Sequence, residues 1–247
     1  MNKASDRLIV ALDVDNASRA LELHETLRDC VGLFKIGMQL FTAAGPELVR
    51  QIVARGSRVF LDLKYHDIPN TVAMAAVQAT RLGVSMFNVH ASGGREMMQR
   101  AAEAVADVAA REGLPRPIVL GVTLLTSADE ATLRQLGISD SPAAVVRRLA
   151  ALTKSCGLDG VVASARELKI IRDELHDQNF VIVCPGIRGA QDASHDQRRS
   201  MSCGDAIRAG ADYVVVGRPV LNADSPAQAA RALQAEIQSA MTAAAGN

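Results

Sequence analysis

Tryptophan is absent from this sequence and other aromatic residues are scarce, which limits the ligands that the protein can stack against. Aromatic residues make up 3% of the 247 positions. Proteins that bind single-stranded nucleic acid combine aromatic platforms with a basic groove. This chain instead balances 27 basic against 27 acidic residues, for a formal net charge of zero. We therefore expect no nucleic-acid partner.

Long apolar runs, an export signal and paired cysteines are also missing. No apolar segment approaches the roughly 20 residues that a membrane-spanning helix needs, and the first residues contain no apolar signal region or cleavage site. The cysteines at positions 30, 156, 184 and 203 form no CxxC pair. This usage predicts free thiols rather than disulfides or a metal site. We expect a cytoplasmic protein with no membrane contact.

What the sequence does contain is a regular alternation of strand-like and helix-like segments. Hydrophobic residues form 49% of the chain, enough for a large core. Short continuous apolar runs are typical of strands that are covered on both faces. The expected strands are Leu8–Val14, Leu33–Gly37, Arg58–Lys64, Met86–His90, Ile118–Thr123, Gly160–Ser164, Phe180–Cys184 and Tyr213–Gly217.

Helix-like segments fill most of the intervals between these runs. Examples are Ser18–Cys30, Pro46–Arg55, Asn70–Leu82, Arg95–Arg111, Ala143–Cys156 and Glu167–His176. Pro226–Ala243 is expected to be the last helix, followed by a tail that frays after about residue 243. Eight such repeats in ~250 residues predict one α/β domain over residues 1–247, a (β/α)8 TIM barrel. A doubly wound open sheet is the alternative, but no GxGxxG follows the first strand.

Two segments interrupt the alternation. Arg188–Cys203, after the seventh expected strand, is long and polar, as loops that close over ligands often are. Ser127–Pro142, after the fifth, reads either as a connection with a short helix or as a functional segment. The sequence leaves both roles open.

The third expected strand carries charge where a buried strand would avoid it. Asp62 and Lys64 are two residues apart, so on an extended strand their side chains point to the same face. Isolated charges are costly inside an apolar run unless they are paired. Asp67 follows closely, and Pro69 stands near the first turn of the next helix. Two acids and a base at the end of a strand indicate chemistry.

Other strands are predicted to bring polar residues to the same rim, because barrel enzymes place their active sites at the carboxyl ends of the strands. Asp13, Lys35 and His90 lie at such ends. Each has a structural alternative: Asp13 as a helix cap, Lys35 extending to the surface and His90 as a packed rim residue. The Gly- and Arg-containing segments 185–189 and 217–219 follow the last two strands, where barrels often bind phosphate. The pattern favours a phosphorylated substrate.

The segment around Asp62 also resembles a known family. Asp62-x-Lys64-x-x-Asp67-Ile68-Pro69-Asn70-Thr71 matches the signature of orotidine 5'-phosphate decarboxylases at every defined position. The flanking matches, in the same order as in bacterial members, are Ala11–Asp13, Phe34–Gly37, Leu125–Ser127, Pro185–Arg188 and Val216–Pro219. The resemblance spans Leu8 to about Pro219. Cys184 departs from the Thr or Ala that many members have before the Pro-Gly-Ile turn.

The resemblance implies a homodimeric carboxy-lyase that converts orotidine 5'-monophosphate (OMP) to UMP and carbon dioxide without metal or organic cofactor. Lys64 would be the proton donor, in a charged array with Lys35, Asp62 and the partner's Asp67. The substrate-binding residues would be Asp13 and Lys35 at the ribose, Thr71 across the dimer, Thr126 and Pro185 near the pyrimidine, and Arg188, Gln197, Gly217 and Arg218 at the phosphate. Opposite charges on either side would favour the ammonium form of Lys64.

Two alternative functions are also compatible with the sequence. Metal-dependent decarboxylases or aldolases of the same superfamily share the Asp-x-Lys-x-x-Asp core but act on sugar phosphates. A non-catalytic nucleotide-binding barrel would keep the phosphate contacts and lose the charged array. The segment Ile68–Thr71 and the Pro185–Arg188 turn favour the nucleotide enzyme over the first, and the complete array favours an enzyme over the second.

Overall fold

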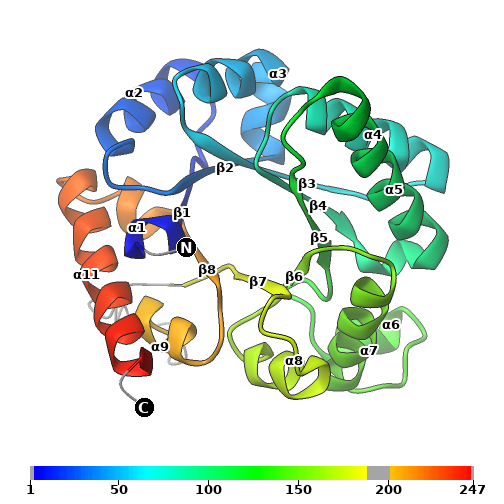
Figure 1. The fold of residues 1–247 in the computed structure, drawn as a ribbon. Coiled ribbons are helices and arrows are strands. Elements are labelled where there is room, and N and C mark those ends of the chain that lie inside the picture. Colours follow the sequence, from blue (N-terminus) through cyan, green and yellow to red (C-terminus); the bar gives the residue numbers. More distant parts are fainter. Residues whose placement is uncertain (1–2, 188–200, 246–247) are drawn as a thin grey trace. The chain divides into compact units, whose positions relative to one another are not determined.

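The fold is an eight-stranded parallel barrel, as the alternation predicted. The computed structural model describes residues 3–187 and 201–245. The strands are β1 (Leu8–Ala11), β2 (Leu33–Gly37), β3 (Arg58–Tyr65), β4 (Met86–His90), β5 (Ile118–Val122), β6 (Gly160–Val162), β7 (Val181–Cys184) and β8 (Tyr213–Val216). They join in chain order as a closed barrel, which excludes the open doubly wound sheet (Figure 1).

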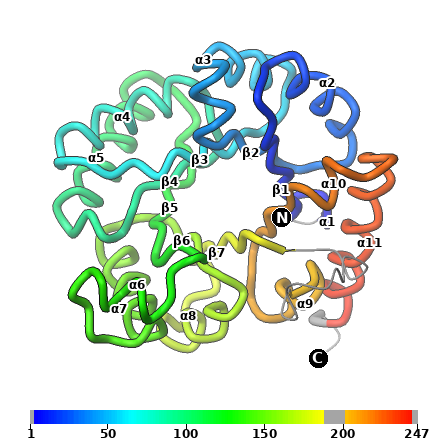
Figure 2. The backbone as a smooth tube through the Cα atoms, turned by 180° about the vertical axis from the view of Figure 1, so that it is seen from behind, coloured from blue at the N-terminus to red at the C-terminus, as the bar shows by residue number. Residues whose placement is uncertain are grey.

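The barrel falls into two compact units, the first comprising residues 1–62 and 184–247. In it β1 pairs in parallel with β2 and β8, and β2 pairs with β3 so that Gly37 lies opposite Asp62. The helices of this unit are α1 (Ala4–Arg7), α2 (Ala17–Leu27), α3 (Met38–Ala54), α9 (Cys203–Arg208), α10 (Arg218–Leu221) and α11 (Pro226–Ala245). Figure 2 shows α2 beside α3 along these strands.

The second unit comprises residues 63–183. Here β4 pairs with β5, β5 with β6 and β6 with β7, all in parallel. Its helices are α4 (Pro69–Arg81), the 3-10 turn η1 (Ala91–Gly93), α5 (Gly94–Glu112), α6 (Glu130–Gln135), α7 (Pro142–Ser155) and α8 (Leu168–Leu175). The helices α4 and α5 pack side by side outside β4 (Figure 1).

The helix α3, Met38–Ala54, consists of two helical segments that meet at Gly45, where φ is 67° and ψ is −171°. Glycine permits this non-helical, left-handed φ. The second segment begins at Pro46, as predicted, and Pro fits a first helical turn. The first segment, which begins at Met38, was not predicted.

The other differences are the short helices α1, α9 and α10, for which no helix was named from the sequence, and shifts at element ends. The strand β1 stops at Ala11, three residues before the predicted Val14, because the chain leaves the ladder as it approaches the rim. The last helix continues to Ala245, past the expected fraying point near 243. The predicted loop Arg188–Cys203 lies largely outside the described residues, and α9 begins at Cys203. The segment 127–142 contains the short helix α6, which agrees with its reading as a decorated connection.

All four cysteines are free and buried, which confirms the prediction of unpaired thiols. Burial raises the pKa of the Cys30 thiol, and it raises that of Cys203 to about 12. Since the thiolate is the reactive form, these two side chains behave as small apolar core residues.

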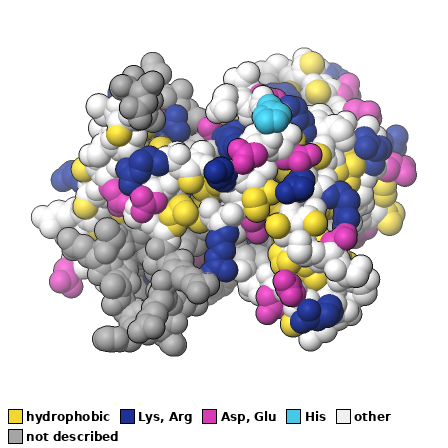
Figure 3. Space-filling model, turned by 90° about the horizontal axis from the view of Figure 1, so that it is seen from below, with side chains coloured by type: hydrophobic (Ala, Val, Ile, Leu, Met, Phe, Trp, Pro, Cys, Tyr) yellow, Lys and Arg dark blue, Asp and Glu magenta, His cyan; other side chains and the backbone are white. Residues whose placement is uncertain are grey.

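The surface follows the balanced composition. On the face drawn in Figure 3, Lys and Arg side chains alternate with Asp and Glu, and neither sign forms a continuous field. Across the described residues no helix has the length and apolar character to cross a membrane.

A buried histidine in the first unit links stability to pH. His24 on α2 is fully buried, its Nε2 lies 2.8 Å from Ser57 Oγ, and its ring packs 4.9 Å from that of Phe34. Burial lowers the pKa of His24 from its ordinary value of 6.5; the nearby Glu25 opposes this shift, whereas Arg55 and Arg28 add to it. Because the unfolded chain binds the proton more readily, stability is lost as the pH falls below 6.5.

We therefore expect His24→Gln to flatten the acid side of the stability profile. Gln keeps a polar group near Ser57 without a titrating charge, so its free energy of unfolding should change less between about pH 7.5 and about pH 5.5 than that of the wild type. Urea unfolding followed by circular dichroism checks this. The control is His176→Asn: His176 is exposed with φ 47°, a conformation that Asn tolerates. An unchanged slope in His24→Gln would contradict the assignment.

Candidate active site

An ion-pair cluster centred on the buried Lys35 occupies the carboxyl ends of the first three strands, within the first unit. Lys35 on β2 is only 9% exposed, and its Nζ lies 3.1 Å from Asp13 Oδ1 and 3.4 Å from Asp62 Oδ2. A buried charge needs such partners, because without them nothing offsets the cost of removing it from water. The predicted meeting of these three side chains is therefore observed. The alternative in which Lys35 extends to the surface is wrong.

Two glycines make room for this cluster. A Cβ at Gly37 would lie 2.9 Å from Lys35 Nζ, and one at Gly217 would lie 3.4 Å from Asp13 Oδ2. A side chain at position 37 would therefore push the amine away from its carboxylates. Gly217 precedes α10, and the first residue of α10 is the exposed Arg218. Gly217 and Arg218 are the two predicted phosphate contacts that the structure describes in this unit.

Asp13 does not cap the following helix, which removes its structural alternative. The N-cap of α2 is Asn16, whose side chain accepts a hydrogen bond from the Arg19 N–H at 2.9 Å. The carboxylate of Asp13 is half-exposed and accepts from Lys35 instead. Asp13 therefore does not cap a helix, and its carboxylate forms part of the ion-pair cluster.

In the second unit, the main chain of Lys64 departs from strand geometry. Its φ is 50°, in the left-handed region that residues other than Gly rarely adopt. The prediction that Asp62 and Lys64 face the same way rested on an extended strand, and that premise fails at Lys64. Such conformations cost about 1–3 kcal/mol and concentrate at functional sites.

A residue to which the sequence reading gave no role supports this conformation. The N–H of Lys64 donates to the Oδ1 of Asn88 on β4 at 2.8 Å, and Asn88 is fully buried. The available signal was a polar side chain in the middle of the apolar strand Met86–His90. A second missed feature is a histidine pair, with the rings of His66 and His90 5.3 Å apart.

Asp67 and Thr71 lie exposed at the start of α4. Asp67 Oδ1 accepts from the N–H of Ile68 at 2.6 Å, and Pro69 opens the helix as predicted. This hydrogen bond leaves the other carboxylate oxygen available to a partner. Thr126, in the loop after β5, is also exposed.

The turn after β7 begins with half-buried Pro185 and continues through Gly186. Gly186 has φ 74°, which explains the preference for glycine there. Arg188 and Gln197, both predicted to bind phosphate, lie outside the described residues.

The sixth strand is followed by a carboxylate with a structural role. Glu167 accepts a hydrogen bond from the Ser164 N–H at 2.8 Å and thereby closes the turn before α8. Burial raises the pKa of Glu167, and the Ser164 hydrogen bond partly opposes the shift.

A closed parallel barrel with a buried lysine between two aspartates at its strand ends has the architecture of a (β/α)8-barrel enzyme. The model of the orotidine 5'-phosphate decarboxylase / HUMPS family matches residues 6–233, and the chain belongs to this family. Orotidine 5'-phosphate decarboxylase of Syntrophotalea carbinolica is 52% identical over 240 residues, covering 97% of this chain and 98% of the relative. That of Moorella thermoacetica is 50% identical over 236 residues, covering 95% and 93%.

A solved structure agrees with these sequence relatives. The crystal structure of orotidine 5'-phosphate decarboxylase from Lactobacillus acidophilus superposes with a TM-score of 0.82 at 35% identity, covering 93% of this chain and 98% of that one. The resemblance predicted from the motifs is confirmed at the level of the family.

Proposed function

We propose that this protein is an orotidine 5'-phosphate decarboxylase that converts OMP to UMP and carbon dioxide in pyrimidine biosynthesis. The observation that carries the proposal is buried Lys35, held between Asp13 and Asp62 in the strand order of the family's charged array. Relatives of that name cover nearly the whole chain at about half identity, which supports the same reaction here.

In the proposed reaction Lys64 is the proton donor. The bond between C6 and the substrate carboxylate breaks, carbon dioxide leaves, and the electron pair stays on C6. The Lys64 ammonium stabilises this charge and then donates a proton to form the C6–H bond of UMP. Asp62 would repel the substrate carboxylate, a ground-state contribution that we rank below electrostatic stabilisation.

The substrate contacts divide by distance from the reacting bond. Asp13 and Lys35 would hold the ribose, while Thr126 and Pro185 would lie near the pyrimidine. The phosphate would be bound by Gly217 and Arg218 together with Arg188 and Gln197. Binding energy from such a remote group can lower the barrier of the chemical step, beyond simple affinity.

We also propose a homodimer in which Asp67 and Thr71 complete the partner's site. Apolar side chains beside them are exposed in the single chain: Ile68 is 66% exposed and Met74 on α4 is 52% exposed. Large exposed apolar side chains are a feature of surfaces that bind other proteins. Burying this surface against a second copy would bring the exposed Asp67 and Thr71 to that copy's substrate.

The second candidate is a metal-dependent enzyme that acts on sugar phosphates, since the family description covers more than the decarboxylases. The motif Ile68–Thr71 and the turn at Pro185 favour the nucleotide substrate, as in the sequence argument. A non-catalytic nucleotide-binding barrel is disfavoured by the buried Lys35 with its two carboxylate partners, because placing a lysine in a buried site has a desolvation cost that nucleotide binding alone does not require.

Decarboxylation of OMP by the purified protein in excess EDTA tests the proposal. We expect rapid conversion to UMP that does not depend on added metal. The conversion is monitored by the loss of OMP absorbance. Conversion that requires added magnesium and a sugar phosphate would assign the protein to the second candidate. Binding of UMP without any turnover would favour the nucleotide-binding barrel.

Two further expectations accompany this function. We infer that residues 1–247 form one domain, because strands of both compact units belong to a single closed barrel. The urea unfolding described for His24 checks this inference, since one domain gives one transition. We also infer a cytoplasmic location, in keeping with free thiols and a biosynthetic role.

A further inference from the structure

The hydrogen bond between Asn88 and the main chain of Lys64 joins two unusual features of the second unit. Asn88 is a fully buried amide in β4, flanked by the apolar Phe87 and Val89. Its Oδ1 accepts from the Lys64 N–H at 2.8 Å. A buried polar side chain is retained in such surroundings only when it has a partner, and one partner here is the peptide group of the predicted proton donor.

The conformation of Lys64 makes this partner informative. Among residues 3–187 and 201–245, the only residues other than Gly with positive φ are Lys64 and His176. His176 is the left-handed C-cap of α8, a common place for this conformation. Lys64 instead lies in β3, one residue before its end, where the ladder favours extended backbone. The left-handed turn at Lys64 therefore needs a local interaction that supports it.

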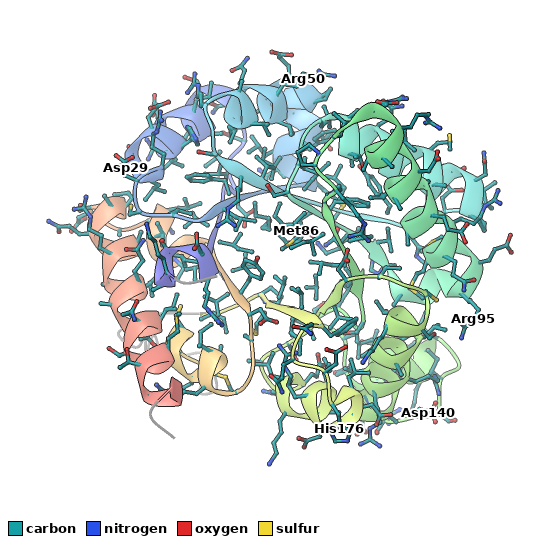
Figure 4. The ribbon with its side chains drawn as sticks, viewed as in Figure 1. Asp29, Arg50, Met86, Arg95, Asp140 and His176 are labelled. Atoms are coloured by element: carbon teal, nitrogen blue, oxygen red, sulfur yellow. The ribbon has the colours of Figure 1, made fainter. Side chains whose placement is uncertain are left out.

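The Asn88 side chain points in the direction needed to support the left-handed backbone of Lys64. Figure 4 shows Met86 on the side of β4 that faces away from α4 and α5, whereas Arg95 on α5 points outward. Side chains two residues apart on a strand share a face, so Asn88 belongs to the Met86 side. The amide is thus directed away from the helices of its own unit, and it meets Lys64 at the end of β3.

We propose that Asn88 is a positioning residue that holds Lys64 in its left-handed conformation and thereby fixes where the ammonium group lies. The inference rests on the proposed function. Asn88 acts through the peptide N–H of Lys64 and not on the substrate. A displacement of about 1 Å in a reacting group can lower the rate by about 10²-fold, so loss of this acceptor slows proton transfer without removing any substrate contact.

The primary test compares Asn88→Ala with Asn88→Asp and Thr153→Val. Asn88→Ala removes the acceptor and is expected to lower kcat by about 10²-fold, with KM and the dissociation constant of UMP within about threefold of wild type. Asn88→Asp keeps an acceptor oxygen at the same position and should recover at least about tenfold of that loss. It is also the variant to use if Asn88→Ala does not fold.

Thr153→Val is the matched control for the loss of a buried hydrogen bond. Thr153 is fully buried on α7, and its hydroxyl donates to Leu149 O at 2.7 Å. Its replacement should lower stability and leave kcat within about twofold of wild type. Equal losses of kcat in Thr153→Val and Asn88→Ala, or a loss confined to KM, would overturn the proposal.

A double-mutant cycle separates positioning from general damage. If Asn88 acts only through Lys64, adding Asn88→Ala to Lys64→Ala should leave the residual rate unchanged within about twofold. A further large decrease would mean that Asn88 supports the site by another route, and it would overturn the proposal.

Amide hydrogen exchange gives a readout that does not depend on activity. The chain contains lysine only at Lys3, Lys35, Lys64, Lys154 and Lys169, so selective ¹⁵N-lysine labelling resolves the Lys64 amide. This amide should exchange at least about tenfold faster in Asn88→Ala than in wild type and Asn88→Asp. Unchanged protection would overturn the proposal. If wild-type protein failed to convert OMP, the proposed function would fail while this experiment still tested the Asn88–Lys64 link.

Discussion

Alanine in place of Lys64 is expected to lower kcat for OMP decarboxylation by about 10⁴-fold or more, because in the proposed mechanism its ammonium group supplies both charge stabilisation and the proton. The affinity for UMP should fall less than about tenfold, since ribose and phosphate contacts lie away from C6. Single-turnover kinetics with OMP and calorimetry with UMP measure the two effects separately.

Lys154→Ala is the control for the loss of a lysine charge. Lys154 lies on α7, where it forms an ion pair with Asp177 at 2.8 Å. Its replacement should leave kcat within about twofold of wild type, because a surface ion pair contributes little. A Lys64→Ala protein that turned over OMP near the wild-type rate would exclude Lys64 as the proton donor.

Mixed dimers of Lys64→Ala and Asp67→Ala are expected to regain activity that neither variant has alone. If each site uses Lys64 of one chain and Asp67 of its partner, a mixed dimer contains one intact site and one doubly defective site. Isolated mixed dimers should then show about half the wild-type activity, and a random mixture about a quarter. Two different affinity tags allow mixed dimers to be purified before the assay.

The control pairs Lys64→Ala with Asp62→Ala. Asp62 and Lys64 are two residues apart on β3 of the same chain, so each site of this mixed dimer keeps one defect and no activity should return. Recovery in both mixtures would indicate contamination by wild-type protein. Absence of recovery in the Asp67 mixture, with mixed dimers confirmed by sedimentation, would contradict a site shared between chains.

Much of the fold was predictable because the interior of a parallel barrel requires continuous apolar strands. The bounds of β2 and β4 agree with the sequence reading residue for residue. Pro69 placed the start of α4 within one residue, since proline fits only the first turn. The helical segment before Gly45, which begins at Met38, was missed, whereas the segment that begins at Pro46 was predicted.

The candidate site was predictable in its membership and only partly in its geometry. Asp13, Lys35 and Asp62 were expected at one rim, and Lys35 forms ion pairs with both carboxylates. Their meeting follows from strand order, because parallel strands bring their carboxyl ends to the same edge. The structure then excluded the surface position of Lys35 and the capping role of Asp13, which the sequence alone had left open.

The sequence by itself determined the barrel and the family, and it predicted that Asp13, Lys35 and Asp62 lie at one rim. Apolar periodicity and a long specific motif are local properties of the chain. The tertiary structure decided the left-handed conformation of Lys64 and its hydrogen bond to Asn88. These depend on two strands that are 24 residues apart at the bonded positions. No local pattern around Lys64 encodes which buried acceptor will meet its N–H, since that acceptor is supplied only when β3 and β4 have folded.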